Sequence, residues 1–197
     1  MVSIDLLLAY GATYRKVKRQ EFIFKEGQMA SFLYVIEEGR VKMFNINDEG
    51  REFIQGIFHA GNSFGEPPVI IGEEYPANAV AMDDSILLRI SREKLLLMLS
   101  ENPEVHLQFT TMLASRLLAK AQNMKDLTSY GPEHRIHSLL KQYKKHCGCP
   151  DADTLKVELT RQEIADMTGL RVETVIRTMK AMEEKGMLQI ENRKVLI

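Results

Sequence analysis

The sequence has only two cysteines, Cys147 and Cys149, which stand two positions apart in 197 residues. A disulfide between such near neighbours would close too short a loop to stabilise a fold, and two thiols are too few for a metal site built from cysteine alone. The chain also lacks any apolar run of the roughly 20 residues that cross a bilayer, and its first residues show no signal-peptide pattern. We therefore expect a cytoplasmic protein with no membrane partner.

An excess of one charge is also missing, because 26 basic residues balance 27 acidic ones. Net charge therefore gives no indication of a nucleic-acid partner. The residues from Gly131 onward carry 12 basic and 10 acidic side chains, whereas the preceding part carries 14 and 17. Local patches matter more than net charge, so this asymmetry permits a DNA-binding C-terminal part. The length and the unbiased composition fit two modest globular domains.

The first half of the chain contains short apolar segments separated by turn residues. Glycine stands in several of these turns, where it supplies the positive φ that other residues resist. Many short strands with regularly spaced turns are typical of an antiparallel sandwich or barrel. We predict an N-terminal β-barrel, related to cupin barrels, with strands at 21–25, 32–37, 41–46, 52–58, 77–82 and 86–90.

Helical patterns replace the strands after Ser91, which is a good N-cap for a short helix at 95–99. Pro103 then suits a first helical turn, and we expect its helix to run to about Leu127. Apolar residues recur on it every three or four positions. This stripe packs either on the chain's own barrel or against a second copy, and its length favours a homodimer. Its members are Val105, Phe109, Met112, Leu113, Leu117, Ala121 and Met124.

Gly131-Pro132 interrupts the helical pattern and marks a domain boundary. An amphipathic helix from 133 to about 146 and a short strand at 155–159 follow. The chain is thus expected to form an α+β protein with three parts. They are a sensor barrel with flanking helices at 1–102, a dimerisation helix and hinge at 103–130, and a DNA-binding domain at 131–197.

The strongest local pattern begins at Thr160, in TRQEIADMTGLRVETVIRTMKAMEEKG. Thr160 and Glu163 have the spacing of a capping box, and Gly169 permits the tight turn between the two helices of a helix-turn-helix. We expect the second helix at about 172–184, with Val175, Met179 and Met182 as its buried face. Residues 187–190 and 195–197 flank a polar turn and predict a β-hairpin wing.

The opposite face of the second helix carries Glu173, Ile176, Arg177 and Lys180, which share one stripe at +3, +4 and +7. Arginine can bond guanine bidentately, glutamate can accept from cytosine, and isoleucine can touch a thymine methyl. The alternative is an ordinary surface ion pair between Glu173 and Arg177. Together with the other motifs, the stripe favours DNA binding. The candidate DNA-contacting residues are Thr160, Arg161, Gln162, Arg171, Glu173, Thr174, Ile176, Arg177 and Lys180.

With these motifs, nearly the whole sequence resembles the cyclic-AMP receptor protein/FNR (CRP/FNR) family of bacterial transcription regulators. The resemblance implies that the N-terminal barrel is a jelly roll like that of cyclic-nucleotide-binding domains. It also implies a homodimer that binds a two-fold symmetric double-stranded operator, contacts RNA polymerase and responds to a small-molecule effector. The recognition helix is most similar to the FNR branch, in which Glu173 and Arg177 would read a TGA-type core. FNR has serine where Ile176 stands. The resemblance is carried by Gly27, Gly39, Gly61, Phe64-Gly65-Glu66, the helix from Pro103, TRQEIA at Thr160 and ETVxR at Glu173.

The sensor part departs from the family's cyclic-AMP binders. Those members hold the cyclic phosphate with an Arg-Ser or Arg-Thr pair, but Tyr75-Pro76-Ala77-Asn78 stands in this stretch. A buried phosphate without a cation is costly, so the sequence argues against cyclic AMP. Two adenine-contacting positions are here Lys120 and Ala121. The candidate effector-pocket residues are Phe64, Gly65, Glu66, Ala77, Asn78 and Lys120, and the effector is not identified.

A few single residues suggest other ways of sensing a signal. Lys120 either points into the barrel and binds an anionic organic effector, or is a solvated lysine on the dimer helix. The cysteine cluster that holds the iron–sulfur cluster of FNR is absent. The pair Cys147 and Cys149 is either a redox or metal feature or incidental. Haem binding through His59 or His106 stays open, although lone histidines are usually structural or solvated.

Two rival classes lack their signatures. A cupin-type enzyme needs clustered histidine and glutamate ligands, and His59 is the only histidine in the barrel region, so we expect neither a metal site nor an enzyme. A cyclic-nucleotide-binding regulatory module of a larger assembly would not need a helix-turn-helix. We therefore predict an effector-responsive DNA-binding regulator, with that module as the alternative.

Overall fold

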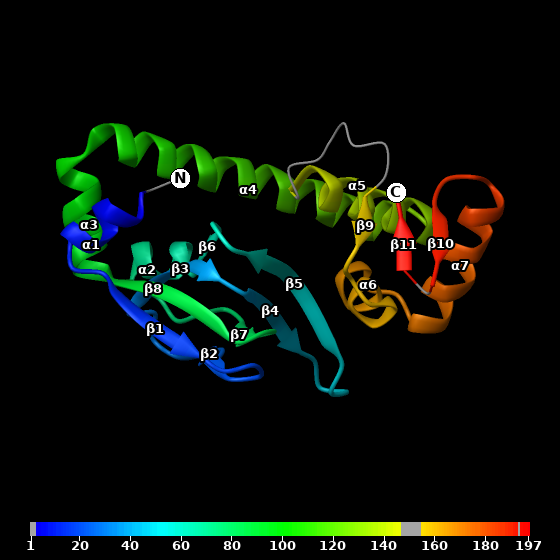
Figure 1. Ribbon diagram of the computed structural model, residues 1–197, viewed down its shortest axis with the longest axis horizontal. Coiled ribbons are helices and arrows are strands. Elements are labelled where there is room, and N and C mark those ends of the chain that lie inside the picture. The colour runs from blue at the N-terminus through cyan, green and yellow to red at the C-terminus, as the bar shows by residue number, and fades with distance from the viewer. Residues whose placement is uncertain (1–2, 147–154, 193) are drawn as a thin grey trace. The chain divides into compact units, whose positions relative to one another are not determined.

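The computed structural model describes residues 3–146, 155–192 and 194–197 (Figure 1). The chain forms two compact units, an N-terminal unit of residues Met1–Arg116 and a C-terminal unit of residues Leu117–Ile197. In the described part of the chain, no helix is both long and apolar enough to cross a membrane. Cys147 and Cys149, singled out above, lie outside the described residues.

The strands of the N-terminal unit form two antiparallel four-stranded sheets, as in a double-sheet jelly roll. They do not close into the single barrel that we expected, because no described hydrogen-bonded ladder joins the edge strands of one sheet to those of the other. The first sheet has the order β1 (Thr13–Val17), β8 (Ser85–Ser91), β3 (Phe32–Glu38), β6 (Ser63–Phe64). The second has the order β2 (Phe22–Phe24), β7 (Asn78–Ala81), β4 (Arg40–Ile46), β5 (Glu52–His59).

The two sheets share one hydrophobic core, to which both contribute alternating inward-facing residues. In β4, Val41 and Met43 are buried, whereas Arg40 before them and Lys42 between them are partly exposed. This alternation is the pattern that predicted the strand. A register shift between Met43 and Phe44 marks an irregularity in the β4–β5 hairpin.

The helices of the N-terminal unit cover the ends of the sheets: α1 (Ile4–Ala9), α2 (Glu66–Ile71), α3 (Arg92–Glu101) and the start of α4 (Pro103–Ser129). Ser91 caps α3 as predicted, because its hydroxyl accepts from the backbone N–H of Lys94. Pro103 begins α4, also as predicted. Four elements were not foreseen from the sequence, namely α1, β1, β6 and α2.

The apolar stripe of α4 divides between two environments. Val105, Phe109, Met112 and Leu113 pack against the core of the N-terminal unit. Leu117 and Met124 of the stripe are exposed to 69%, and Leu107 and Leu118, which lie outside the predicted stripe, are exposed to at least 69%. Part of the stripe thus covers the chain's own sheets, whereas Leu117 and Met124 are exposed in the part of the chain that the structure describes.

The C-terminal unit is a small helical domain with a three-stranded sheet (Figure 1). Its core contains Ile136 and Leu140 of α5 together with Ile164, Val175 and Met179, all at most 2% exposed. The predicted strand and wing are present with slightly different ends. The elements are α5 (Pro132–His146), β9 (Lys156–Val157), α6 (Arg161–Thr168), α7 (Val172–Glu184), β10 (Gln189–Glu191) and β11 (Lys194–Leu196).

A buried carboxylate joins the end of α4 to the start of α5. Asp126 is only 4% exposed and accepts hydrogen bonds from Gln122 Nε2 at 2.8 Å and from Ser138 Oγ. His134 Nε2 lies 3.4 Å from its Oδ1. Burial raises the pKa of Asp126, but the bonds from Ser138, Gln122 and His134 lower it by more, so the pKa lies below its usual value. The network fixes the charged form of Asp126 across the Gly131-Pro132 break.

A carboxylate with a lowered pKa stabilises the fold above its unfolded-state pKa of about 3.9, and this contribution is lost as pH falls through the folded value. Asp126→Asn should therefore lower the free energy of unfolding at pH 7 by on the order of 1 kcal/mol. The free energy of unfolding of this variant should also decrease less steeply than that of the wild type as the pH falls below about 4. Urea unfolding at pH 7 and pH 3 measures both effects. Asp48→Asn, in an exposed turn, is the matched control. An unchanged pH profile for Asp126→Asn would contradict the assignment.

Candidate nucleic-acid interface and effector domain

The first helix of the helix-turn-helix begins with the capping box that the sequence predicted. Thr160 Oγ1 accepts from the backbone N–H of Glu163 at 3.1 Å, and Glu163 Oε2 accepts from the backbone N–H of Thr160 at 2.6 Å. Two otherwise unpaired N–H groups are thereby satisfied. Ile164, Ala165 and Thr168 form the buried inner face of α6, whereas Met167 is only partly buried.

Gly169 makes the turn between α6 and α7 possible. Its φ is +63°, in the left-handed region that favours glycine. A Cβ built there would meet Leu127 Cδ2 at an ordinary 3.7 Å, so backbone conformation rather than space requires glycine. The chain can then start α7 three residues later at Val172, with Arg171 as its N-cap.

The two faces of α7 are separated as the sequence predicted. Val175, Met179 and Met182 are fully buried. Glu173, Ile176, Arg177 and Lys180 are all exposed. No hydrogen bond or ion pair between Glu173 and Arg177 occurs among the described side chains, so the surface-pair alternative is not realised in this structure. Both side chains therefore keep their hydrogen-bonding groups available for a ligand.

The remaining DNA-contact candidates differ in how accessible they are. Arg171 is exposed and Thr174 partly exposed, next to the α7 stripe. Gln162 is exposed but donates to Asp166 Oδ1 at 2.8 Å. Arg161 is partly buried. Burial lowers the pKa of its guanidinium by more than the nearby Glu183 carboxylate raises it, so the pKa lies below its usual value.

The wing is tied to the recognition helix by Glu183. Its Oε1 accepts from the backbone N–H of Ile190 at 2.9 Å, at the start of the β10–β11 hairpin. Val195 pairs with both Ile190 and Val157, so the hairpin joins β9 in one sheet. The end of α7 and the wing are thereby held in a fixed relation within the C-terminal unit.

In the N-terminal unit, the candidate effector residues gather around α2. Gly65 is the N-cap of α2 with φ +85°, and Glu66 follows it with only 2% exposure. The Glu66 carboxylate accepts from Arg116 Nη1 at 2.6 Å, and Arg116 Nη2 donates to Ser63 O at 3.0 Å. Sequence reasoning missed Arg116. Its only signal was a position one helical turn before Lys120 on the same helix.

A cluster of aromatic rings fills the space beside this carboxylate. Phe64 is fully buried, and its ring lies 5.3 Å from that of Tyr34. Phe24 contacts both Tyr34 and Phe64 and stacks on Tyr75 at 3.6 Å. The Tyr75 hydroxyl donates to Phe32 O at 2.5 Å, and burial raises its pKa. Phe24, Tyr34, Phe64 and Tyr75 therefore form one aromatic cluster in the core of the N-terminal unit.

The stretch around Tyr75 differs from that of the family's cyclic-AMP binders. Tyr75 stands in the stretch where cyclic-AMP binders of the resembling family carry arginine, and its side chain is only 4% exposed. Glu66, the acidic residue that was expected to face a ligand, is already paired with Arg116. Tyr75 therefore supplies no cation for a cyclic phosphate, whereas the Arg116 guanidinium lies at the start of α2.

The other effector candidates differ in their burial and contacts. Ala77 is fully buried, and Asn78 is partly exposed with its Oδ1 accepting from the backbone N–H of Glu26 at 3.2 Å. Lys120 is exposed on α4 and belongs to the C-terminal unit. In the part of the chain that the structure describes, no three His, Cys, Asp or Glu side chains form a group able to hold a metal ion.

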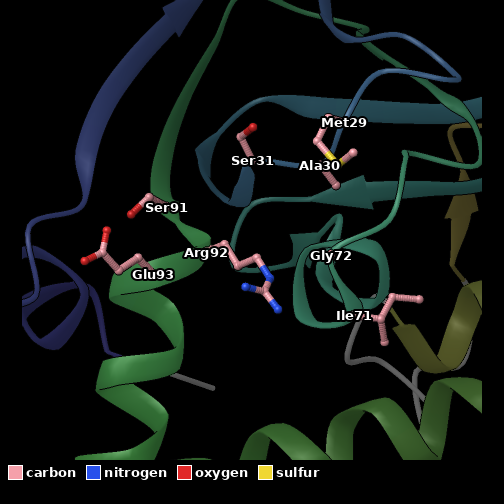
Figure 2. A pocket seen from close by; sticks show the side chains of 8 residues that line it. All are labelled: Met29, Ala30, Ser31, Ile71, Gly72, Ser91, Arg92 and Glu93. Carbon is pink, nitrogen blue, oxygen red and sulfur yellow. The ribbon is translucent and has the colours of Figure 1, made fainter.

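An open cleft of about 520 Å³ lies between α2, α3 and the segment before β3 (Figure 2). Met29 and Ile71 line it and are 62% and 68% exposed. The Arg92 guanidinium lies against Gly72 and donates to Val69 O at 2.9 Å and Ile70 O at 3.2 Å. Arg92 therefore satisfies the last carbonyls of α2 and is not a cation directed at the cleft.

Comparisons with known proteins match both units. Residues 14–102 match the cyclic nucleotide-binding domain model, and residues 134–197 match the Crp-like helix-turn-helix domain model. The chain is 28% identical to the CRP-like cAMP-activated global transcriptional regulator of Mycobacterium tuberculosis, over 91% of this chain and 81% of that protein. It is 26% identical to the transcriptional activator protein anr of Pseudomonas aeruginosa, over 100% of this chain and 80% of that protein.

Solved structures agree in fold. FixK2 from Bradyrhizobium japonicum superposes with a TM-score of 0.81 at 22% identity, covering 94% of this chain and 92% of that one. The catabolite activator protein of Thermus thermophilus is 28% identical, with a TM-score of 0.58 and coverage of 98% and 87%.

Proposed function

The chain belongs to the CRP/FNR family of transcription regulators, and from this membership we propose that it binds a two-fold symmetric DNA operator as a homodimer and regulates transcription in response to an effector. The observation that carries the proposal is the exposed stripe of Glu173, Ile176, Arg177 and Lys180 on the second helix of the helix-turn-helix. Helices of this kind enter the major groove of B-DNA.

The side chains have distinct roles in this proposal. Glu173 accepts from a cytosine amino group and Arg177 donates to guanine O6 and N7, which together read base edges. Lys180 and Arg171 at the borders of the stripe contact phosphates, as do the polar groups of Thr160, Arg161, Gln162 and Thr174. The phosphate contacts orient the domain, whereas the two base-reading residues set the sequence.

Dimerisation is assigned to α4. Leu117 and Met124 are exposed large apolar side chains seven residues apart on this helix, and the exposed Leu118 is next to Leu117, which suits a helix pair. A dimer places two recognition helices about 34 Å apart, in successive major grooves. RNA polymerase is a further partner that family membership implies.

We assign effector binding to the N-terminal unit, and cyclic AMP is disfavoured because Tyr75 stands in the stretch where the family's cyclic-AMP binders carry arginine. The candidate pocket residues remain Phe64, Gly65, Glu66, Ala77 and Asn78, to which Arg116 is now added. Lys120 is retained as a candidate for an anionic effector, with a solvated lysine as the alternative. Effector binding shifts the population between DNA-binding and non-binding arrangements.

Selection from a library of random DNA duplexes tests the proposed function. The full-length protein should enrich a two-fold symmetric sequence whose half-sites lie about 10–10.5 base pairs apart, and its affinity should fall as salt rises. Fluorescence anisotropy on the enriched duplex measures both. Failure to enrich any sequence, with no salt-dependent binding, would contradict the proposal and favour a regulatory module that does not read DNA.

A further inference from the structure

Ile176 is an apolar side chain in the middle of a charged surface. It is 53% exposed, and its neighbours on the stripe are Glu173, Arg177 and Lys180. Large apolar side chains of α7 are otherwise turned inward, because Val175, Met179 and Met182 are all fully buried. The isoleucine therefore stands on the face that carries the ligand-binding groups and not on the face that carries the core.

The fold does not require an isoleucine at this position. The buried stripe of α7 is complete without it, and a β-branched residue is a poorer helix former than alanine, leucine or lysine. Single exposed apolar residues are common on protein surfaces and usually need no explanation. Ile176 differs from that ordinary case because it lies between the two residues that form hydrogen bonds to bases in the proposed function.

We propose that Ile176 reads the C5-methyl group of a pyrimidine in the operator half-site. This inference rests on the proposed function and specifies which base it prefers. The C5-methyl of thymine is the apolar group on the base edges of the major groove, and 5-methylcytosine presents the same group. Isoleucine suits this contact, because one χ1 rotamer dominates in a helix and its methyl groups are held in place before binding.

The position of Ile176 also defines which base pair it reads. It lies three residues, or about 4.5 Å along the helix axis, from Glu173 and one residue, or about 1.5 Å, from Arg177. Base pairs are stacked about 3.4 Å apart. The methyl contact therefore falls on a base pair next to the one that Arg177 reads, within the same half-site.

The experiment starts from the duplex enriched with the full-length protein and removes or adds single C5-methyl groups on its pyrimidines. Each thymine of the half-site is replaced by uracil, and each cytosine by 5-methylcytosine, one at a time in both half-sites. One position adjacent to the Arg177 base pair should respond. Burying one methyl group corresponds to about a fourfold change in affinity per half-site. A loss of affinity with uracil identifies thymine as the base that Ile176 contacts, and a gain of affinity with 5-methylcytosine identifies a methylated cytosine as that base.

Variants connect this response to Ile176. Ile176→Ala should lose the methyl response while its melting temperature stays close to that of the wild type, since the side chain is outside the core. Ile176→Val, which keeps a branched apolar side chain, should retain most of the response. Lys180→Ala is the matched control, because it should weaken binding to every duplex and leave the methyl response intact.

The outcomes separate this inference from the proposed function. Equal affinity for all the methylated and unmethylated duplexes, or a methyl response that persists in Ile176→Ala, overturns the methyl contact and leaves operator binding standing. A protein that enriches no duplex at all overturns the proposed function and with it the role of Ile176.

Discussion

Arg177→Ala is expected to weaken operator binding by about 1–3 kcal/mol, which is roughly a five- to 150-fold loss of affinity. The loss arises because a bidentate contact to guanine disappears and leaves the base edge without its partner in the groove. Arg177 is exposed and makes no ion pair with Glu173 in the free protein, so its removal should not affect folding. Selection from random duplexes, followed by anisotropy at fixed salt, measures both the affinity and the base preference.

The matched control for this prediction is Lys180→Ala on the same exposed face. A lysine that contacts phosphate should weaken binding to all sequences alike and lower the salt dependence by about one counterion. Arg177→Ala should instead relax the preference at one base pair in each half-site. An unchanged half-site preference in Arg177→Ala would show that the assigned base-reading role is wrong.

Phe64→Ala is expected to lower the free energy of unfolding of the N-terminal unit by about 3–5 kcal/mol. Its ring is fully buried and contacts the rings of Phe24, Tyr34 and Phe58, so truncation removes apolar burial and leaves a cavity among them. The loss is comparable with the total stability of a small domain. Urea unfolding monitored by tyrosine fluorescence measures it.

Phe53→Ala makes the same chemical change at a surface position, because this phenylalanine of β5 is 41% exposed. It should cost less than 1 kcal/mol, in the range that surface substitutions typically show, roughly ±0.5 kcal/mol. Equal destabilisation by the two variants would mean that Phe64 does not hold the aromatic cluster together.

Several parts of the structure follow from short-range rules and were predictable. The capping box of Thr160 and Glu163, the left-handed turn at Gly169 and the two faces of α7 all depend on residues within a few positions of one another. Helix periodicity likewise placed the start of α4 at Pro103. Local hydrogen bonds and side-chain spacing are properties of the sequence itself, which is why the DNA-binding candidates could be named from it.

Other parts depend on residues distant in sequence and were missed. Strand β6 has only two residues, and it is a strand because Tyr34 and Val35 of β3 pair with it. Strand β1 exists through its pairing with β8, more than 60 residues away. A two-residue segment carries no detectable periodicity, and a charged edge strand such as Thr13–Val17 shows little apolar alternation.

The sensor region likewise combines features that the sequence predicted with features that depend on tertiary packing. The sequence indicated that an arginine is missing at Tyr75, but not that its ring would stack on Phe24, 51 positions earlier. It singled out Glu66 but not its partner Arg116, 50 positions later. Which charges neutralise each other, and which rings fill an interior, is decided when distant elements pack, because Coulomb and dispersion energies depend on distance in space and not along the chain. The chain alone therefore determined its helix caps, its turns and the outward-facing stripe of α7, whereas only the tertiary structure decided that Tyr75 stacks on Phe24 and that Arg116 pairs with Glu66.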